Sequence, residues 1–390
     1  METRHGELVV GQQKVAQAMG EHMARSAPYN MQEPERGLTG APPWVDERYK
    51  NYMQENKCTR PDQTKLNLRV DKEAYRQAVR KMKTNKAAGP MGIQNEILKQ
   101  MPDRFHEQLC ELMQLMWVHR HTPLPWKKWY FCFHHKQGDV TQQKNYKPIA
   151  LLDCLFKLYT AVLTKMLADF CEINGMLSQS HEGSREKHNT MRQLTRITNA
   201  IEDANLSKQE LHATYIDFEN AYGSVDHEKL LATLKHLGVP AQLTEAIIDI
   251  LGEAEEDSIQ MRANVGDQVS EEIPIRRGIL LGDSMSPLLF ILYLEPLLRW
   301  LEVGNHGYQH MYATDKGLRG ELSTSSGAFV DDLIILTRLM TGMELQLKKL
   351  AAFGDWSGLH INTDKSKITG VENGDRSIRE DRHQGIKCGN

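Results

Sequence analysis

The chain has 390 residues, a formal net charge of −3, 40% hydrophobic residues and 25% charged residues. These values are ordinary for a globular protein of two or three domains or of one large lobed domain, and they exclude a wholly basic nucleic-acid binder. A local basic groove is still compatible with them, because phosphate binding needs only local positive charge.

Three features of the sequence indicate the kind of cell compartment in which the protein resides. The six cysteines form no Cys-x-x-Cys pair, residues 1–20 hold no apolar core of the signal-peptide kind, and the most apolar run, Leu288–Leu294, is too short to span a bilayer. We therefore expect reduced thiols in an intracellular protein, nuclear or cytoplasmic, that makes no use of a membrane.

The first part of the chain divides into a loose arm and a helical region. Residues 1–60, with Gly and Pro clustered in Pro34–Trp44, predict a poorly structured N-terminal tail. From Val70 the apolar residues follow a helical period, and residues 104–119 predict a strong amphipathic helix.

Residues 127–150 mix aromatic and basic residues, and they predict two strands joined by a turn at Gly138-Asp139. The first strand contains Cys132-Phe133-His134-His135, which has metal-ligand residue types. Neighbouring strand residues point to opposite faces, and no second ligand pair follows at zinc spacing, so we expect an ordinary strand. Residues 153–172 return to a helical pattern.

From residue 205 onward the pattern predicts an α+β domain, a small antiparallel sheet covered by helices. Asp226 is the expected N-cap of a helix that ends at Gly238, and Ser286 is the expected cap of a helix that begins at Pro287. Residues 302–327 are polar and Gly-rich and predict a surface insertion. The other expected elements are a strand at His212–Phe218, a helix at Gln242–Leu251, a hairpin of Ser258–Met261 with Val269–Ile275, a helix at Met343–Phe353, and strands at Leu359–Ile361 and Lys367–Val371.

Two adjacent acids, Asp331 and Asp332, interrupt the apolar run Phe329–Leu336. In a straight buried strand one of them would enter the core at a high cost in free energy. A hairpin turn at the acids exposes both at the rim of a sheet. On this run alone a plain acidic turn is the better interpretation.

A second acid, Asp217, ends the strand predicted before it. If that strand lies beside the acidic hairpin, three carboxylates come together, and divalent metal is the usual way to offset such like charges. Two Mg²⁺ ions about 4 Å apart can activate an attacking hydroxyl and hold the leaving oxygen of a phosphate.

These two segments resemble motifs A and C of reverse transcriptases, namely an Asp followed five residues later by the aromatic Tyr222, and an aromatic-x-Asp-Asp turn. Further blocks in the same order resemble LINE-type (non-LTR) retroelement reverse transcriptases over roughly Lys83–Gly370. They are Lys86-Ala87-Ala88-Gly89-Pro90 with Gly92-Ile93 and Glu96; Lys136-x-Gly138-Asp139 with Asn145-Tyr146-Lys147-Pro148-Ile149; Glu182-Gly183 and Arg185 with Asn189-Thr190; Arg276-Arg277-Gly278 with Gly282-Asp283 and Ser286-Pro287; and Ser357-Gly358-Leu359-His360-Ile361-Asn362 with Lys365-Ser366-Lys367.

The resemblance implies a right-hand polymerase. Fingers would span residues 61–205 and the palm residues 206–372, with tails at 1–60 and 373–390. The thumb would be largely missing, because about 20 residues follow the last block.

The resemblance also implies a metal site and a reaction. The metal ligands would be Asp217, Asp331, Asp332 and the Phe218 carbonyl, holding two Mg²⁺ ions, with Mn²⁺ as an alternative. The partners would be an RNA template, a DNA primer and deoxynucleoside triphosphates.

Other site residues follow from the same resemblance. Tyr222 would exclude a 2′-OH and so disfavour an RNA polymerase, Lys136 and Lys147 would meet the triphosphate, and Gly282 would let the backbone approach the nucleotide closely. Lys365 would give a proton to pyrophosphate. Taken singly, these residues are as well explained as a core tyrosine, solvated lysines and a turn glycine.

The sequence also departs from the family at several positions. Gly223 stands where the family has Asp, Leu281 where it has Gln, and Lys147 where it has Arg, which loses a bidentate donor. We therefore expect an RNA-directed DNA polymerase whose activity these substitutions could reduce. The alternative is a catalytically decayed retroelement fragment or a nucleic-acid-binding remnant.

Overall fold

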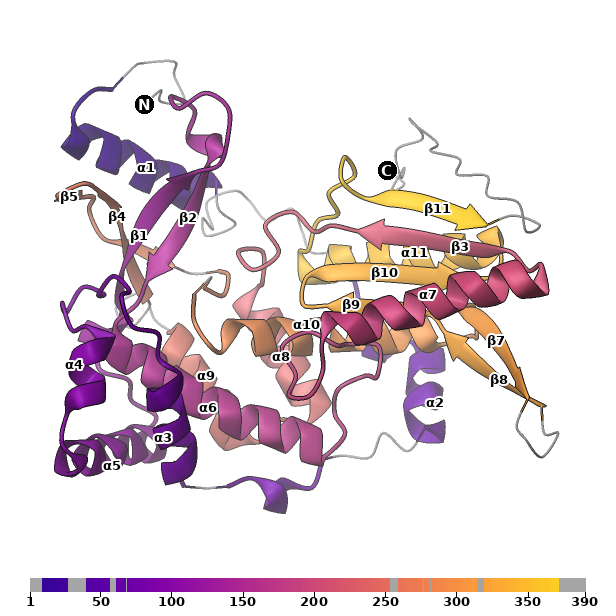
Figure 1. The fold of residues 1–390 in the computed structure, drawn as a ribbon, viewed down its shortest axis with the longest axis horizontal. Coiled ribbons are helices and arrows are strands. Elements are labelled where there is room, and N and C mark those ends of the chain that lie inside the picture. Colours follow the sequence, from indigo (N-terminus) through magenta and orange to yellow (C-terminus); the bar gives the residue numbers. More distant parts are fainter. Residues whose placement is uncertain are drawn as a thin grey trace. The chain divides into compact units, whose positions relative to one another are not determined.

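The computed structural model describes residues 9–26, 40–56, 61–67, 69–252, 259–275, 277–280, 282–313 and 319–371. The chain forms two compact units, which are considered separately. The first unit comprises Met1–Glu35, Asp62–Asn174 and Tyr222–Leu288, and the second comprises Arg36–Pro61, Gly175–Ala221 and Leu289–Asn390. Figure 1 labels their helices and strands.

The first unit contains a mixed sheet in the order β2-β1-β4-β5, with β6 also paired to β4. Antiparallel pairing joins β1 to β2, and parallel pairing joins β1 to β4. The predicted Gly138-Asp139 turn is present, with Gly138 at φ +92° and the Asp139 carboxylate accepting from the Thr141 N–H at 2.8 Å. The strands are β1 (Lys128–His135), β2 (Tyr146–Leu151), β4 (Ile259–Val265), β5 (Gln268–Val269) and β6 (Ile273–Ile275).

Helices make up the rest of the first unit, and α8 illustrates how the sequence sets their ends. The Asp226 side chain accepts from the Lys229 N–H at 3.0 Å, and Gly238 ends the helix at φ +78°, so both predicted caps are confirmed. The helices are α1 (Gln12–Ser26), α3 (Lys72–Lys81), α4 (Asn95–Gln100), α5 (Asp103–His119), α6 (Cys154–Ile173), α8 (His227–Leu237) and α9 (Ala241–Leu251).

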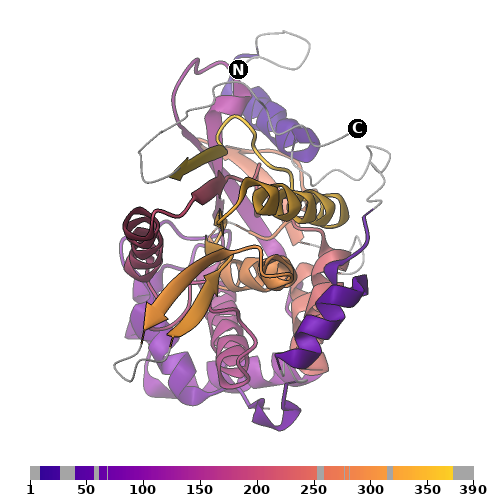
Figure 2. The same ribbon diagram turned by 90° about the vertical axis from the view of Figure 1, so that its right-hand side faces the viewer.

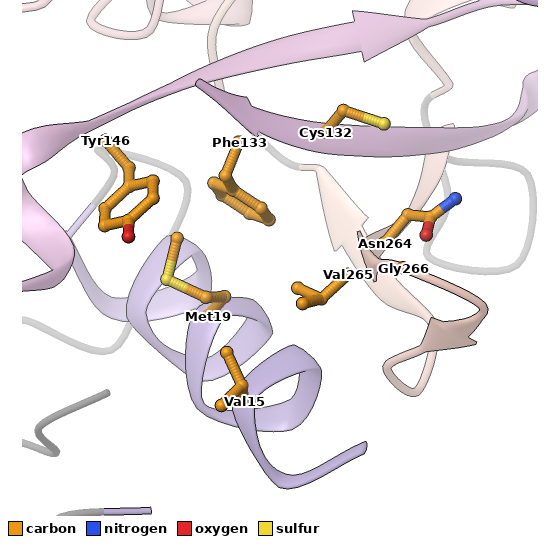
Figure 3. A pocket seen from close by; sticks show the side chains of 8 residues that line it. All are labelled: Val15, Met19, Cys132, Phe133, Tyr146, Asn264, Val265 and Gly266. Carbon is orange, nitrogen blue, oxygen red and sulfur yellow. The ribbon is translucent and has the colours of Figure 1, made fainter. Parts of the chain in front are cut away.

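The helix α1 corrects the expectation of a poorly structured arm. It packs against β4 and β5 and buries Ala16 and Met19. Figure 3 shows Val15 and Met19 directed toward Phe133 and Tyr146 of the β1–β2 hairpin, around a cavity of about 370 Å³. Another helix, α2 (Glu47–Glu55), also falls within this range. Packing against distant strands stabilises such short helices, and local composition does not report it.

The second unit is built on an antiparallel sheet in the order β11-β3-β10-β9, which confirms the predicted α+β class. Its strands are β3 (Leu211–Ile216), β9 (Ser326–Phe329), β10 (Asp332–Thr337) and β11 (Lys367–Val371). Two helices, α7 (Thr190–Ser207) and α11 (Met340–Ser357), cover its faces.

The side chains show that these helices lie on opposite faces, as Figure 2 also shows. On one face Ala200 of α7 shares a buried cluster with Ala213 and Ile334. On the other face the Thr214 hydroxyl donates to the sulfur of Met343 in α11 at 3.1 Å. Alternate residues of a strand point to opposite faces, so both faces of the sheet are buried along most of its length.

The helix α10 (Ser286–Glu302) begins at Ser286 itself, one residue before the predicted start, and belongs to the second unit from Leu289 onward. Residues 302–327 are not wholly a surface insertion, because they include the paired strands β7 (Tyr308–Ala313) and β8 (Arg319–Thr324). Tyr308 is fully buried, and its hydroxyl donates to the Asp203 carboxylate at 2.7 Å. Across the described ranges, no helix is both long and apolar enough to cross a membrane.

Candidate active site

The two adjacent acids lie at a hairpin turn, as the sequence predicts. β9 ends at Phe329 and β10 begins at Asp332, so Val330 and Asp331 form a two-residue turn. Asp331 and Asp332 are exposed, whereas Leu333–Thr337 are buried. The turn therefore keeps both carboxylates in water while the rest of the strand enters the core.

The strand register brings a third acid beside them. β10 pairs with β3 so that Leu333 faces Ile216, and one further step of this register places Asp332 opposite Asp217. Directly opposite residues of an antiparallel pair project from the same face. Asp217 and Asp332 therefore stand side by side where their strands end, next to Asp331 in the turn.

A lysine lies on the other side of Asp217. β11 pairs with β3 from Lys367, which faces Tyr215, and Lys365 lies in the turn just before β11. The Lys365 Nζ lies 3.5 Å from the Asp217 Oδ2. The predicted residues Asp332, Asp217 and Lys365 thus lie side by side, in one row at this end of the sheet.

Backbone contacts fix the position of Asp217. Its N–H donates to the Ser366 hydroxyl at 3.1 Å, and its carbonyl accepts from the Asn362 N–H at 2.8 Å. The Glu219 N–H donates to the His360 carbonyl at 2.8 Å. These two backbone bonds involve the Asp217 carbonyl and the Glu219 N–H, which flank Phe218. Neither of them uses the Phe218 carbonyl. Ser366 had no predicted role, although it lies within a block that carries the family resemblance.

The electrostatics of the row favour a cation. Partial burial raises the pKa of Asp332, and the negative charges of Asp331 and Asp217 raise it further. A hard divalent ion would offset this repulsion, and carboxylate oxygens are the ligands it prefers. Among the residues that the structure describes, however, no three or more His, Cys, Asp or Glu side chains close around one point as a metal cluster. The carboxylates have the chemistry of metal ligands and lie at neighbouring backbone positions, but their side chains do not converge on one point.

The remaining predicted site residues belong to the first unit. Lys136 is exposed, and its N–H closes the β1–β2 hairpin by donating to the Asn145 carbonyl at 2.9 Å. Lys147 lies in β2 opposite His134, and its side chain falls outside the described part of the structure. Both backbone positions are thus on the predicted hairpin.

Tyr222 and Gly282 also lie in the first unit. The Tyr222 carbonyl accepts from the Ile279 N–H at 2.8 Å, which ties its loop to the loop that carries Gly282. Gly282 has φ +113°, and an added Cβ would lie 3.3 Å from the Ala150 carbonyl oxygen at the end of β2. Glycine is favoured there by backbone conformation and by space. Leu281, the most marked departure from the family, lies outside the described residues.

Three carboxylates at the ends of adjacent strands in an antiparallel sheet are the arrangement expected of a metal-dependent polymerase. A profile of the family described as "Reverse transcriptase (RNA-dependent DNA polymerase)" matches residues 134–378, more than half of the chain. The chain therefore belongs to the reverse transcriptase family, whose members use divalent metal ions in general.

Relatives narrow the family to its non-LTR branch, as the sequence predicts. The chain is 27% identical over 264 residues to the "Retrovirus-related Pol polyprotein from type-1 retrotransposable element R2" of Popillia japonica, covering 65% of this chain and 34% of the relative. It is 26% identical over 222 residues to the "Probable RNA-directed DNA polymerase from transposon BS" of Drosophila melanogaster, covering 57% and 24%. It is 25% identical over 256 residues to the "RNA-directed DNA polymerase from mobile element jockey" of the same fly, covering 63% and 27%. The chain spans about a third or less of the length of each relative.

Proposed function

We propose that this chain catalyses RNA-directed DNA synthesis as the polymerase core of a non-LTR retroelement. The observation that carries the proposal is the row of Asp217, Asp332 and Lys365, with Asp331 in the adjoining turn, in a member of the reverse transcriptase family. In the reaction, the primer 3′-OH attacks the α-phosphate of a deoxynucleoside triphosphate opposite an RNA template, and pyrophosphate leaves.

The proposed palm spans residues 206–372 and the proposed fingers span residues 61–205. Residues 1–60 contain α1 and α2, and the expected tail at 373–390 lies outside the described residues. The antiparallel sheet of the second unit supports the palm assignment, because it carries all three acids. The β1–β2 hairpin supports the fingers assignment, because it carries Lys136 and Lys147.

In the proposed site, Asp217, Asp331, Asp332 and the Phe218 carbonyl would hold two Mg²⁺ ions, with Mn²⁺ as an alternative metal. Such ions would supply a lower pKa for the attacking hydroxyl and stabilisation of charge on the leaving oxygen. Lys365 would give a proton to the departing pyrophosphate, and its ion pair with Asp217 at 3.5 Å supports this assignment.

The proposed substrate contacts come from the first unit. Lys136 and Lys147 donate charge-assisted hydrogen bonds to the triphosphate. The ring of Tyr222 lies under the sugar and excludes a 2′-OH, which selects deoxynucleotides over ribonucleotides. Gly282 lets the backbone come close to the nucleotide base.

A primer-extension assay tests the proposal. Folded protein, an RNA template annealed to a DNA primer, deoxynucleotides and Mg²⁺ should give extended primer, and EDTA should abolish the extension. RNA binding without any metal-dependent extension would overturn the proposal. It would favour the alternative of a decayed fragment that retains only nucleic-acid binding, for which Gly223 and Leu281 are the sequence indications.

A further inference from the structure

The turn that carries the acids has an unusual backbone. Val330, its first residue, has φ +60°, whereas Asp331 is outside the positive-φ region. This is the pattern of a type II′ hairpin turn, whose first central position is ordinarily glycine. A β-branched residue in the left-handed region is strained, so something outside the turn must hold it there.

Gly183 packs closely against the backbone of this turn. A Cβ added to Gly183 would lie 2.5 Å from the Val330 backbone nitrogen, 2.7 Å from its Cγ2 and 3.0 Å from the Phe329 carbonyl carbon. Gly183 itself does not have a positive φ, so its own backbone would accept alanine. Only the close approach of the two backbones requires glycine at this position.

The segment around Gly183 is attached to the sheet as an additional partner of β9. The Glu182 N–H donates to the Ala328 carbonyl at 2.9 Å, and the Ala328 N–H donates to the Ser180 carbonyl at 2.7 Å. His181 pairs with Ala328 in a parallel bridge. Two backbone bonds therefore set the segment Ser180–Gly183 against the strand that leads into the turn.

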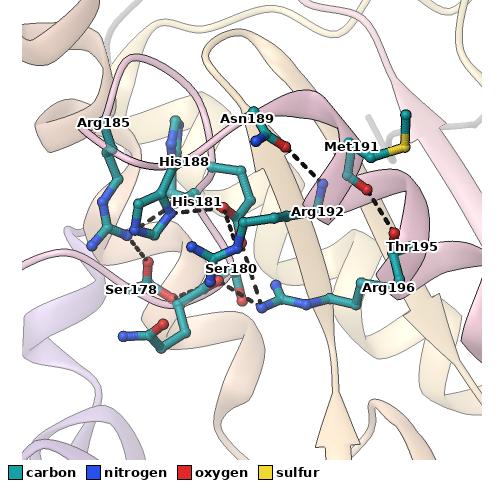
Figure 4. Close-up of polar contacts among 12 residues, drawn as sticks. Ser178, Ser180, His181, Arg185, His188, Asn189, Met191, Arg192, Thr195 and Arg196 are labelled. Atoms are coloured by element: carbon teal, nitrogen blue, oxygen red, sulfur yellow. Dashed lines mark hydrogen bonds and ion pairs between the residues drawn. The ribbon is translucent and has the colours of Figure 1, made fainter.

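A polar cluster keeps this segment in place, as Figure 4 shows. The buried Glu182 carboxylate lies 2.7 Å from the His188 Nδ1 and 3.4 Å from the Arg192 Nε. Arg185 donates to the carbonyls of Ser178 and His181, at 2.8 and 3.0 Å. Buried charge with several partners is costly to rearrange, so the cluster resists movement of the segment.

We propose that Gly183 is a positioning residue for the catalytic turn. The segment Ser180–Gly183 presses on the backbone of Val330, holds it at positive φ, and so fixes where the carboxylates of Asp331 and Asp332 stand. The proposal rests on the proposed function, because it assigns those carboxylates to the metal site. It explains how the turn tolerates valine at a position that suits glycine.

The test compares Gly183→Ala with Gly370→Ala. Gly370 lies in β11, at the opposite edge of the sheet from β9 and the turn. A Cβ added to Gly370 would lie 2.9 Å from the Leu211 carbonyl oxygen, so this substitution is also crowded by backbone. Amide hydrogen exchange at residues 329–333 should rise about tenfold in Gly183→Ala and stay at the parental level in Gly370→Ala. Mn²⁺ affinity, measured by electron paramagnetic resonance on folded protein, should fall about tenfold in Gly183→Ala alone.

A Val330→Gly background sharpens the test, because glycine holds a positive φ without outside support. The effects of Gly183→Ala on exchange and on Mn²⁺ affinity should shrink in that background. If Gly183→Ala does not fold, Arg185→Met loosens the same segment without a clash and should raise exchange at residues 329–333 in the same way.

Parental exchange and parental Mn²⁺ affinity in folded Gly183→Ala would overturn the proposal, as would equal effects in Gly370→Ala. If Gly183→Ala does not fold, parental exchange in Arg185→Met would do the same. The exchange measurement uses neither metal nor substrate. A failure of polymerase activity is therefore distinguishable from a failure of the positioning role.

Discussion

Replacing Lys365 with alanine should slow catalysis strongly but change the stability of the fold only slightly. The Lys365 Nζ lies 3.5 Å from the Asp217 Oδ2, and the two side chains are 69% and 37% exposed. Coulomb's law gives about 1.2 kcal/mol for such a pair in bulk water, and the entropy of ordering two exposed side chains offsets most of it. The free energy of unfolding should therefore fall by less than about 1 kcal/mol.

The effect on chemistry should be much larger. If Lys365 gives a proton to pyrophosphate, its loss should slow single-turnover incorporation by about 10²–10⁴-fold. Lys365→Arg should also be slow, because a guanidinium keeps the charge but does not release its proton. The matched control is Lys367→Ala, another exposed lysine at the start of β11. A parental rate for Lys365→Ala, or an equal loss in Lys367→Ala, would refute this role.

Three further predictions concern selectivity and stability. Tyr222→Ala should raise ribonucleotide incorporation relative to deoxynucleotide incorporation, and an unchanged ratio of the two rates would refute the sugar-gate role. Asp332→Asn should stabilise the protein at pH 7, because burial and the neighbouring acids raise the pKa of Asp332, so ionisation costs folding free energy as the pH rises. That advantage should disappear as the pH falls below the ordinary aspartate pKa of about 3.9, and a lower urea midpoint for Asp332→Asn at pH 7 would contradict it. Arg299→Met should lower the free energy of unfolding in urea by about 3–5 kcal/mol. The Arg299 Nε lies 2.8 Å from the buried Glu295 carboxylate, and the substitution leaves that buried charge without its cationic partner. A decrease of less than about 1 kcal/mol in the free energy of unfolding would contradict the idea that Glu295 needs Arg299 to remain buried.

Some features of this chain could be predicted because one local constraint decides them. Two acids cannot both sit in a buried strand, so the pair Asp331-Asp332 forces a turn. An Asp followed by a helical pattern that ends at Gly defines both ends of α8. Only the family resemblance implies that Asp217, Asp332 and Lys365 lie together, and the structure supplies the β3–β10 register and the Lys365–Asp217 ion pair that bring them there.

Other features depend on contacts between distant parts of the chain, which composition does not report. α1 packs against strands more than a hundred residues away, and residues 308–313 pair with residues 319–324 as strands although their sequence predicts a polar insertion. The Glu182-Gly183 pair is visible in the sequence as a block, but the need for glycine there arises only from the backbone of Val330. The pKa of His181 also depends on the fold, because burial, together with the charges of Arg185 and His188, lowers it to about 4 and keeps the ring neutral at pH 7.

The most direct test of the central claim is single-nucleotide incorporation on an RNA template with Mg²⁺, comparing the parent with Asp331→Asn. The matched control is Asp355→Asn, which removes an exposed acid from α11 in the same unit. We predict that the parent and Asp355→Asn extend the primer at similar rates and that Asp331→Asn falls to background. Parental incorporation by Asp331→Asn would contradict the assignment of the acidic turn as the catalytic metal site.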